Sequence, residues 1–359
     1  MKKSINLAGA YIGIIVGAGF ASGQEVLQFF TYFGIYSIPA VILATILFAF
    51  LGMQIVQLGS NMQTASHKKV IYHICGRYVG LAVDVLITFF LFGVTVVMIA
   101  GSGSIFQQQF GIPATIGSIV MTVITIATLL LDIKKIMSII SIITPFLLVI
   151  MIIVAGYSFF NMDYSFSQIQ NYAEPSSAAA SNWVMGSLLY VSYNIAAGIA
   201  MLIVMGGTFT NKKEAGWGGV LGGIGLGVLL FLINLGMLSD MPGIQGVDMP
   251  TLFLANEISP ILGNILSIVL LGMVYNTAVG MLYAFTARFA PIETKTFKAS
   301  VVVIGILAFL ASFVGFITLV GTVYPVTGYI GFIVIIAVII SWFRSRKQVG
   351  ALKEESVKG

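Results

Sequence analysis

Charged residues are scarce in this sequence: Asp, Glu, Lys and Arg make up only 8% of its 359 residues, whereas hydrophobic types make up 58%. Soluble domains carry about 25% charged residues, so a soluble globule of this size would lack the side chains needed to cover its surface. Intrinsic disorder is excluded too, because disordered chains combine low hydrophobicity with high charge. The composition predicts an integral membrane protein and argues against a soluble enzyme or a nucleic-acid binder.

Cysteine and histidine are nearly absent, with one Cys and two His in the chain. Cys75 therefore has no partner for an internal disulfide. His67 and His73 lie near it, at a spacing that matches no familiar zinc site. Ser22 stands in no Gly-x-Ser-x-Gly elbow and the apolar runs hold no histidine, so Ser–His hydrolysis has no support. We expect a protein that is not an enzyme and that has no resident cofactor.

Long apolar runs fill most of the chain. About 20 helical residues span the ~30 Å hydrocarbon layer of a bilayer, and a membrane barrel would instead show short alternating segments. Runs of the required length number ten: 5–34, 36–60, 79–101, 112–131, 137–160, 183–206, 217–239, 261–289, 299–320 and 326–343. We therefore predict an all-α, multi-pass membrane protein with ten transmembrane helices.

The net charge of +5 is a signal of topology, because the 17 basic residues fall in six clusters separated by enough chain for two crossings each. The clusters are Lys2 and Lys3; Lys68, Lys69 and Arg77; Lys134 and Lys135; Lys212 and Lys213; Arg288, Lys295 and Lys298; and Arg344, Arg346, Lys347, Lys353 and Lys358. The intervening segments carry acids instead, namely Asp163, Glu174, Asp240, Asp248 and Glu257. The positive-inside rule places all six clusters and both termini in the cytoplasm, and the basic tail could also contact anionic lipid.

A polar segment at 161–182 divides the chain into two halves of five runs each. Halves with an odd number of crossings have opposite orientations, which is the arithmetic of an inverted-topology repeat. We predict a first repeat at 1–160, an outer connecting segment, a second repeat at 183–343 and a cytoplasmic tail at 344–359. Within the polar segment 240–260, the sequence MPTLFLANEIS is expected to form a short helix on the outer face.

The first run holds an unusual centre, GAGFASGQE at 17–25, with three glycines and one carboxylate. Each glycine lowers helix propensity by about 1 kcal/mol relative to alanine, so we predict a break in the helix. Backbone groups freed inside a membrane need partners; half-helix N-termini favour carboxylates and loose carbonyls favour cations. Close helix packing is the alternative explanation of the glycines. Glu25 favours function, because a carboxylate within a span usually marks an ion, proton or substrate path.

The same region also resembles a secretory signal peptide, since Lys2 and Lys3 precede the apolar run 5–18 and the small residues at 21–23. We favour a first transmembrane helix, because cleavage would leave helix 24–34 without its other half. Intact mass of the purified protein distinguishes the two.

The sixth run has a polar centre followed by small residues, and it opens the second half as the first run opens the first half. Asn and Ser compete with helical hydrogen bonds and Gly weakens the helix further. Interruptions at corresponding positions of two halves point to a transport site, so we predict a second break over 190–198. Interhelical hydrogen bonding is the alternative. The polar residues concerned are Tyr190, Ser192, Tyr193 and Asn194.

Three further features lie in later or neighbouring runs. Asn276 and Thr277 bring side-chain oxygens to membrane depth, and hard cations prefer oxygen ligands. The glycines of the seventh run, spaced by four as in Gly219 and Gly223, suit close helix contact rather than a dinucleotide site. Asp84, near the inner end of the third run, is expected to snorkel or to pair with a loop cation such as Arg77.

At these residues the sequence resembles the amino acid–polyamine–cation and neurotransmitter–sodium symporter superfamily, which has the LeuT fold. It resembles more closely the YkvI-like bacterial membrane proteins. The stretch GIIVGAGFASGQE, which starts at Gly13, is similar to the broken first helix of that group. The resemblance covers the ten runs. The chain lacks the two extra helices that twelve-span relatives have.

The resemblance implies roles for particular residues. Backbone of the first helix would line a central substrate site faced by two side chains of the sixth: Val16, Gly17, Ala18 and Gly19, with Tyr193 and Asn194 opposite. A sodium site would use three backbone carbonyls, from Gly13, Val16 and Met273, and two side chains, from Asn276 and Thr277. Asn276 replaces one of two hydroxyl residues in the symporter pattern. Glu25 has no acid counterpart in many relatives, so we add it to the substrate site from its position alone.

Together these features predict a secondary active transporter, a cation-coupled symporter of an amino acid or related small organic solute that works by alternating access. Sodium is the coupling ion that the resemblance implies, and Glu25 keeps a proton open. The alternative is a membrane receptor or sensor that keeps a transporter fold and moves nothing.

Overall fold

The computed structural model describes residues 2–63, 67–131, 143–162, 165–292 and 294–358. All regular structure within these ranges is helical. The α-helices are α1 (Lys2–Ile15), α2 (Ala18–Ser22), α3 (Gln24–Phe29), α4 (Ser37–Met62), α5 (His67–Phe110), α6 (Ala114–Leu130), α8 (Ile143–Phe160), α9 (Trp183–Gly207), α10 (Lys212–Leu238), α11 (Met241–Ile244), α12 (Pro250–Ile258), α13 (Pro260–Thr286), α14 (Lys295–Ser312) and α15 (Phe316–Lys358). Short 3-10 helices are η1 (Thr31–Tyr36), η3 (Phe166–Tyr172) and η4 (Pro175–Ser177).

An apolar helix lies in every predicted run, although residues 137–142 of the fifth run are outside the described ranges. Among the described residues, seven helices are long and apolar enough to cross a membrane, and Ala114–Leu130 and Phe146–Phe160 are shorter apolar helices. The remaining run, the first, is divided among α1, α2 and α3. The protein is therefore an all-helical, multi-pass membrane protein. That all ten runs cross, and that the two halves are inverted repeats, stay predictions. Of the residues used for the topology, Lys134, Lys135 and Asp163 lie outside the described ranges.

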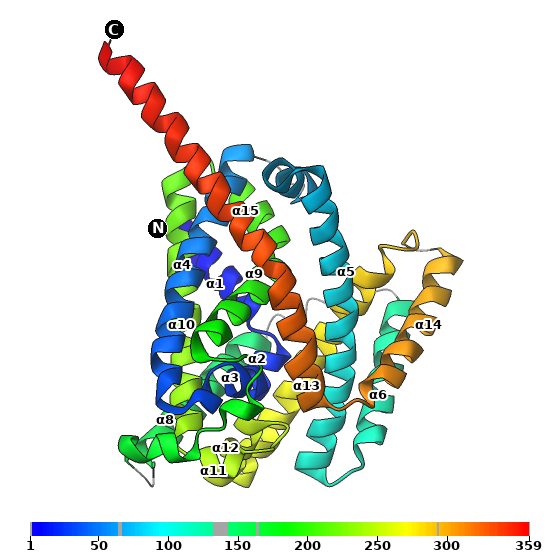
Figure 1. Cartoon of the computed structure of the whole chain (residues 1–359). Coiled ribbons are helices and arrows are strands. Elements are labelled where there is room, and N and C mark those ends of the chain that lie inside the picture. Colours follow the sequence, from blue (N-terminus) through cyan, green and yellow to red (C-terminus); the bar gives the residue numbers. More distant parts are fainter. Residues whose placement is uncertain (1, 64–66, 132–142, 163–164, 293, 359) are drawn as a thin grey trace.

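The long helices form two groups (Figure 1). In one group α10 packs against α1 and α4, and α9 packs against α4. In the other, α5 packs against α6, α13 and α14. Helix α15 contacts both α9 and α5, so it joins the two groups. Segments far apart in the sequence are thus brought to a common centre between the groups.

Glycines bring α10 directly onto the backbone of α4, as their spacing predicted. A Cβ on Gly219 would lie 2.6 Å from the carbonyl carbon of Gly52, and one on Gly223 would lie 2.6 Å from that of Phe48. These distances are far below ordinary contact, so no side chain fits between the helices at these points. Without a hydrophobic drive between helices in lipid, such close packing is what holds them together.

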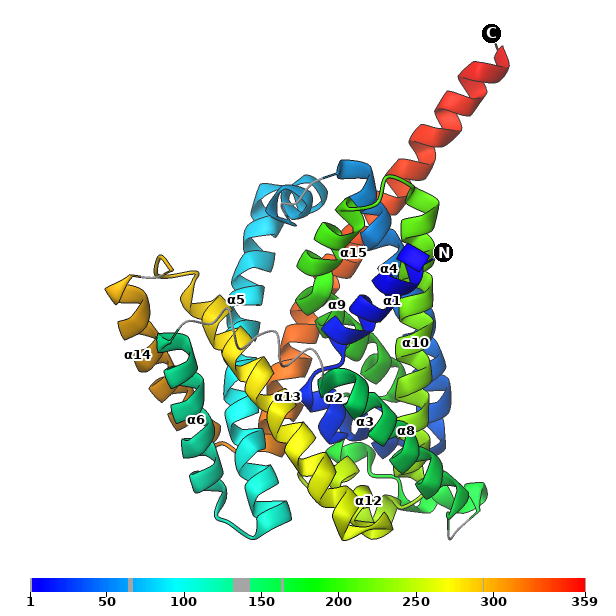
Figure 2. The same cartoon turned by 180° about the vertical axis from the view of Figure 1, so that it is seen from behind.

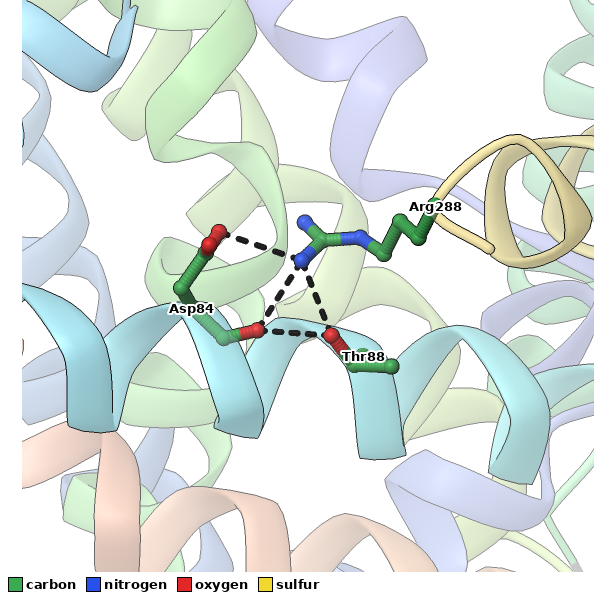
Figure 3. A network of polar contacts seen from close by, with 3 residues as sticks. All are labelled: Asp84, Thr88 and Arg288. Carbon is green, nitrogen blue, oxygen red and sulfur yellow. Dashed lines mark hydrogen bonds and ion pairs between the residues drawn. The ribbon is translucent and has the colours of Figure 1, made fainter. Parts of the chain in front are cut away.

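The other group is braced by an ion pair between α5 and the turn that follows α13 (Figure 3). Nη1 of Arg288 lies 3.1 Å from Oδ1 of Asp84 and donates to Oγ1 of Thr88 at 2.8 Å. The expectation that Asp84 pairs with a basic residue is confirmed, but its partner is Arg288 in place of the suggested Arg77. Sequence position alone favoured a nearby residue, whereas the packing of α13 on α5 supplies a distant one.

The connecting segments also take regular shapes. The predicted short helix in 240–260 is α12, whose N1 position is Pro250. The segment 161–182 forms η3 and η4 and bonds back to the first half, through Glu174 N to Tyr32 O at 2.9 Å and Ala179 N to Gln28 O at 3.0 Å. Helix α15 extends into the segment predicted as a cytoplasmic tail, 344–359, as far as Lys358.

Candidate functional site

The first helix is broken where its glycines predicted. Helix α1 ends at Ile15, Gly17 is extended with φ −105° and ψ −175°, and α2 follows. A second interruption separates α2 from α3 at Gly23, whose φ of 83° lies in the left-handed region. Most side chains disfavour that conformation and glycine does not. The prediction of an interrupted first helix is confirmed.

Side chains of α12 and of the broken segment itself partly satisfy the backbone that this break frees. Oγ1 of Thr251, on α12, donates to the carbonyl of Ala21 at 2.6 Å, and Oγ of Ser22 donates to that of Gly19 at 2.8 Å. Helix α12 lies at the end of the molecule away from both termini (Figure 2). It therefore covers the broken segment from that end, as a membrane-embedded break requires.

A cavity of about 270 Å³ adjoins the break and is lined by α1, α5, α9, α13 and α15 together with residues 16–19 and Glu25. All the residues predicted for the substrate and sodium sites line it: Gly13, Val16, Gly17, Ala18, Gly19, Glu25, Tyr193, Asn194, Met273, Asn276 and Thr277. The structure thus brings together residues up to 264 positions apart, from Gly13 to Thr277. Their roles in binding stay predictions.

Glu25 is the one acidic residue among the described residues that line this cavity. Its side chain is only 6% exposed. The hydroxyl of Tyr193 donates a hydrogen bond to its Oε2, and the hydroxyl of Tyr324 also hydrogen-bonds its carboxylate. The rings of the two tyrosines stack, with centroids 4.9 Å apart and planes 10° apart. The acid of the broken helix is thereby tied to α9 and α15.

The absence of a side chain at Gly19 allows this arrangement. A Cβ there would overlap the carboxylate of Glu25 and would lie 3.1 Å from the hydroxyl oxygen of Tyr324. A glycine at this point of the break is therefore required for the carboxylate to approach the backbone. By contrast, a Cβ on Gly17 would meet nothing within 4 Å.

The predicted break over 190–198 is wrong: α9 is a continuous helix from Trp183 to Gly207. Its polar side chains find partners without disturbing the helix. Nδ2 of Asn194 donates to the carbonyl of Tyr190 at 2.9 Å, and Oγ of Ser192 donates to that of Gly328 on α15 at 2.7 Å. The alternative explanation, interhelical hydrogen bonding, accounts for Ser192, whereas Asn194 bonds within its own helix.

The residues proposed for a cation lie on two helices that face the same cavity. Gly13 lies near the end of α1, close to the break, and Met273, Asn276 and Thr277 lie on α13. Val16 lies between α1 and α2, where the chain leaves the helix. Within the described ranges, no group of three or more His, Cys, Asp or Glu gathers to hold a metal. The candidate oxygen ligands are carbonyls, an amide and a hydroxyl.

Several lining residues were missed by sequence reasoning. Phe90, Val94 and Met98 come from α5, and Tyr324 from α15. The α5 residues stand in a continuous aliphatic and aromatic run with no local chemical signal. Tyr324 directly precedes Pro325, which interrupts helical hydrogen bonding. A tyrosine followed by a proline was the one local sequence feature that could have indicated Tyr324 as a lining residue.

Comparisons with known proteins agree with the relationship expected from the first helix. No family model matches the chain. The chain is 26% identical to "Uncharacterized membrane protein YkvI" of Bacillus subtilis (strain 168) over 313 residues, which are 86% of this chain and 88% of YkvI. It is thus a homologue of a YkvI-like membrane protein, as predicted.

Solved structures give the fold. The structure matches MhsT in complex with L-phenylalanine with a TM-score of 0.60 and 15% identity, over 91% of this chain and 87% of MhsT. It matches a mutant of the manganese transporter of Eremococcus coleocola with a TM-score of 0.57 and 14% identity, over 91% and 75% of the two chains. These likenesses show the LeuT fold. In this chain the first helix of that fold is interrupted, whereas the sixth, α9, is continuous.

Proposed function

Because the chain has the LeuT fold and a YkvI-like sequence, we propose that it is a secondary active transporter, a cation-coupled symporter of an amino acid or related small organic solute. The observation that carries the proposal is the cavity beside the break in the first helix. Transporters of this architecture bind their cargo where broken helices meet other helices near the bilayer midplane. The bound L-phenylalanine of MhsT makes amino acids the first class to test.

Alternating access supplies the mechanism. We propose that both termini are cytoplasmic, so that α12 and the Glu25–Tyr193–Tyr324 contact close the cavity on the outer side. Opening would separate the carboxylate from at least one tyrosine, and closing would restore the contact. A solute or ion that binds one state better than the other shifts the population between them. The protein would move its solute unchanged, so its role is not enzymatic.

We propose sodium as the coupling ion. The proposed ligands are the carbonyls of Gly13, Val16 and Met273 with the side chains of Asn276 and Thr277, and these five residues line the cavity. Oxygen ligands of this kind suit hard cations. An ion held by α1 and α13 together would link the two helix groups and so favour the conformation in which its ligands meet. A proton carried by Glu25 is the other coupling ion to test.

Counterflow in proteoliposomes tests the transport function. Vesicles are loaded with unlabelled amino acids, amines or nucleobases, and entry of the labelled solute is followed with sodium or with potassium present. We expect saturable, sodium-dependent counterflow, lost in Thr277→Val and kept in Thr286→Val. Thr286 lies on the same helix, bonds the carbonyl of Leu282 at 2.8 Å and does not line the cavity. A solute that stabilises the protein without any counterflow would indicate a receptor instead.

A further inference from the structure

The charge of the cavity narrows the class of solute. Among the described residues that line it, Glu25 is the only acid and none is Lys, Arg or His. A buried carboxylate without a positive partner is costly, because its loss of hydration is not repaid. The two tyrosine hydroxyls donate hydrogen bonds to it but carry no charge. A positively charged group that enters the cavity can therefore pair with Glu25, whereas a negatively charged group finds no basic side chain among the described lining residues.

The shape of the cavity calls for more than a bare ion. Its volume of about 270 Å³ approaches the ~300 Å³ at which pockets for small organic ligands begin. One part of its wall is apolar or aromatic, with Phe90, Val94, Met98, Met273 and Met281, and the polar side chains of Asn194, Asn276 and Thr277 line another part. The apolar part matches an aliphatic or aromatic body, and the polar centre at Glu25 matches a single charged head.

A carboxylate retains acceptor capacity after two hydroxyls have bound it, since its two oxygens offer about four lone-pair sites. Glu25 faces the cavity, as does Asn194, whose Nδ2 is already used by the carbonyl of Tyr190 and whose amide oxygen is an acceptor. An ammonium group has three donors and no acceptor. It can therefore bind Glu25 and neighbouring oxygens at once, which a hydroxyl with its single donor cannot.

From this arrangement we propose that the solute is a small organic amine, whose ammonium group binds Glu25 while its apolar body packs against Phe90 and the methionines. The proposal rests on the transport function proposed above and narrows its solute class. A zwitterionic amino acid would bring its own carboxylate next to Glu25, and no basic side chain among the described lining residues would pair with it. An amine without a carboxylate avoids that cost.

Matched solutes test the proposal on the full-length purified protein. One set shares a phenylethyl body, as 2-phenylethylamine, L-phenylalanine and 2-phenylethanol, and a second set shares a branched aliphatic body, as isopentylamine, L-leucine and isopentanol. Ligand affinity is measured from thermal stabilisation, and counterflow is measured in proteoliposomes. At least one amine is expected to bind at least tenfold more tightly than its amino acid and alcohol.

Variants of the acid supply the control. Glu25→Gln is expected to lose at least tenfold in amine affinity, whereas Glu25→Asp keeps the preference for amines with weaker affinity. Glu257→Gln, an exposed acid on α12 that does not line this cavity, is expected to bind as the natural protein does. If Glu25→Gln does not fold, the matched solutes and Glu25→Asp still decide the matter.

The two proposals fail in different ways. Equal or tighter binding of the amino acid or alcohol overturns the amine inference, as does unchanged amine affinity in Glu25→Gln. Counterflow of such a neutral or zwitterionic solute would then leave the transport function standing. Amine binding that depends on Glu25 but gives no counterflow supports the amine inference and overturns transport.

Discussion

Replacing Gly223 by alanine tests how closely α10 packs on α4. The new Cβ would lie 2.6 Å from the carbonyl carbon of Phe48, whereas carbon atoms pack at about 3.5–4.0 Å. The obstacle is backbone, so the helices must move apart by about 1 Å. Overpacking of this kind costs about 1–3 kcal/mol. Alanine regains about 1 kcal/mol of helix propensity, but separation also loosens the contact at Gly219. We expect a net loss of roughly 1–2 kcal/mol in the free energy of unfolding.

Unfolding in mixed micelles, titrated with sodium dodecyl sulfate and followed by tryptophan fluorescence, measures this loss. The matched control is Gly156→Ala on α8, where a Cβ would meet nothing within 4 Å. It is expected to leave stability unchanged or to raise it by up to about 1 kcal/mol. If Gly223→Ala behaves like Gly156→Ala, the two backbones do not touch and the reasoning on the α4–α10 contact is refuted.

Other consequences of the structure can be measured in the same preparation. The side chain of Gln24 is fully buried, and neither amide atom has a hydrogen-bond partner among the residues that the structure describes, so Gln24→Met is expected to raise the free energy of unfolding by about 1–3 kcal/mol; a decrease would reveal a partner for the amide. Asp84 is 28% exposed in its ion pair, so Asp84→Asn is expected to cost less than about 1 kcal/mol. That cost should shrink further at high salt, and a salt-independent loss would contradict it. Gly19→Ala should displace the Glu25 carboxylate and reduce solute affinity at least tenfold, whereas Gly156→Ala, which lies outside the cavity and is tested in the same binding assay, should keep it.

Hydropathy and local helix strength made the first helix predictable. Its apolar length indicated a membrane helix, and its glycines indicated where that helix would give way, because both properties depend on residues close together in the sequence. Gly17 and Gly23 do mark the two interruptions. The positions that line the cavity on α13 could be chosen on similar grounds, since Asn276 and Thr277 are polar in an apolar run.

The same reasoning failed on α9 because its outcome depends on distant partners. Ser192 and Asn194 weaken a helix only if their side chains compete for its backbone. Here Ser192 donates to Gly328, which lies 136 residues away, and a Cβ on Gly331 would lie 2.6 Å from the Ser192 hydroxyl oxygen. The glycines of α15 thus let it approach α9 closely enough to accept the bond. No pattern within the sixth run contains that information.

Because the first helix is interrupted and α9 is continuous, backbone groups and side chains contribute differently to the two sides of the cavity. Two broken helices would offer freed backbone groups from both sides of the cavity, whereas here only the first helix does. The continuous helix contributes side chains instead, and Tyr193 reaches the carboxylate of Glu25 from it. A backbone dipole is fixed in place, but a tyrosine hydroxyl can release the carboxylate when a solute arrives. The continuity of α9 therefore makes the Glu25–Tyr193 contact, more than a second break, the element through which binding would be coupled to opening.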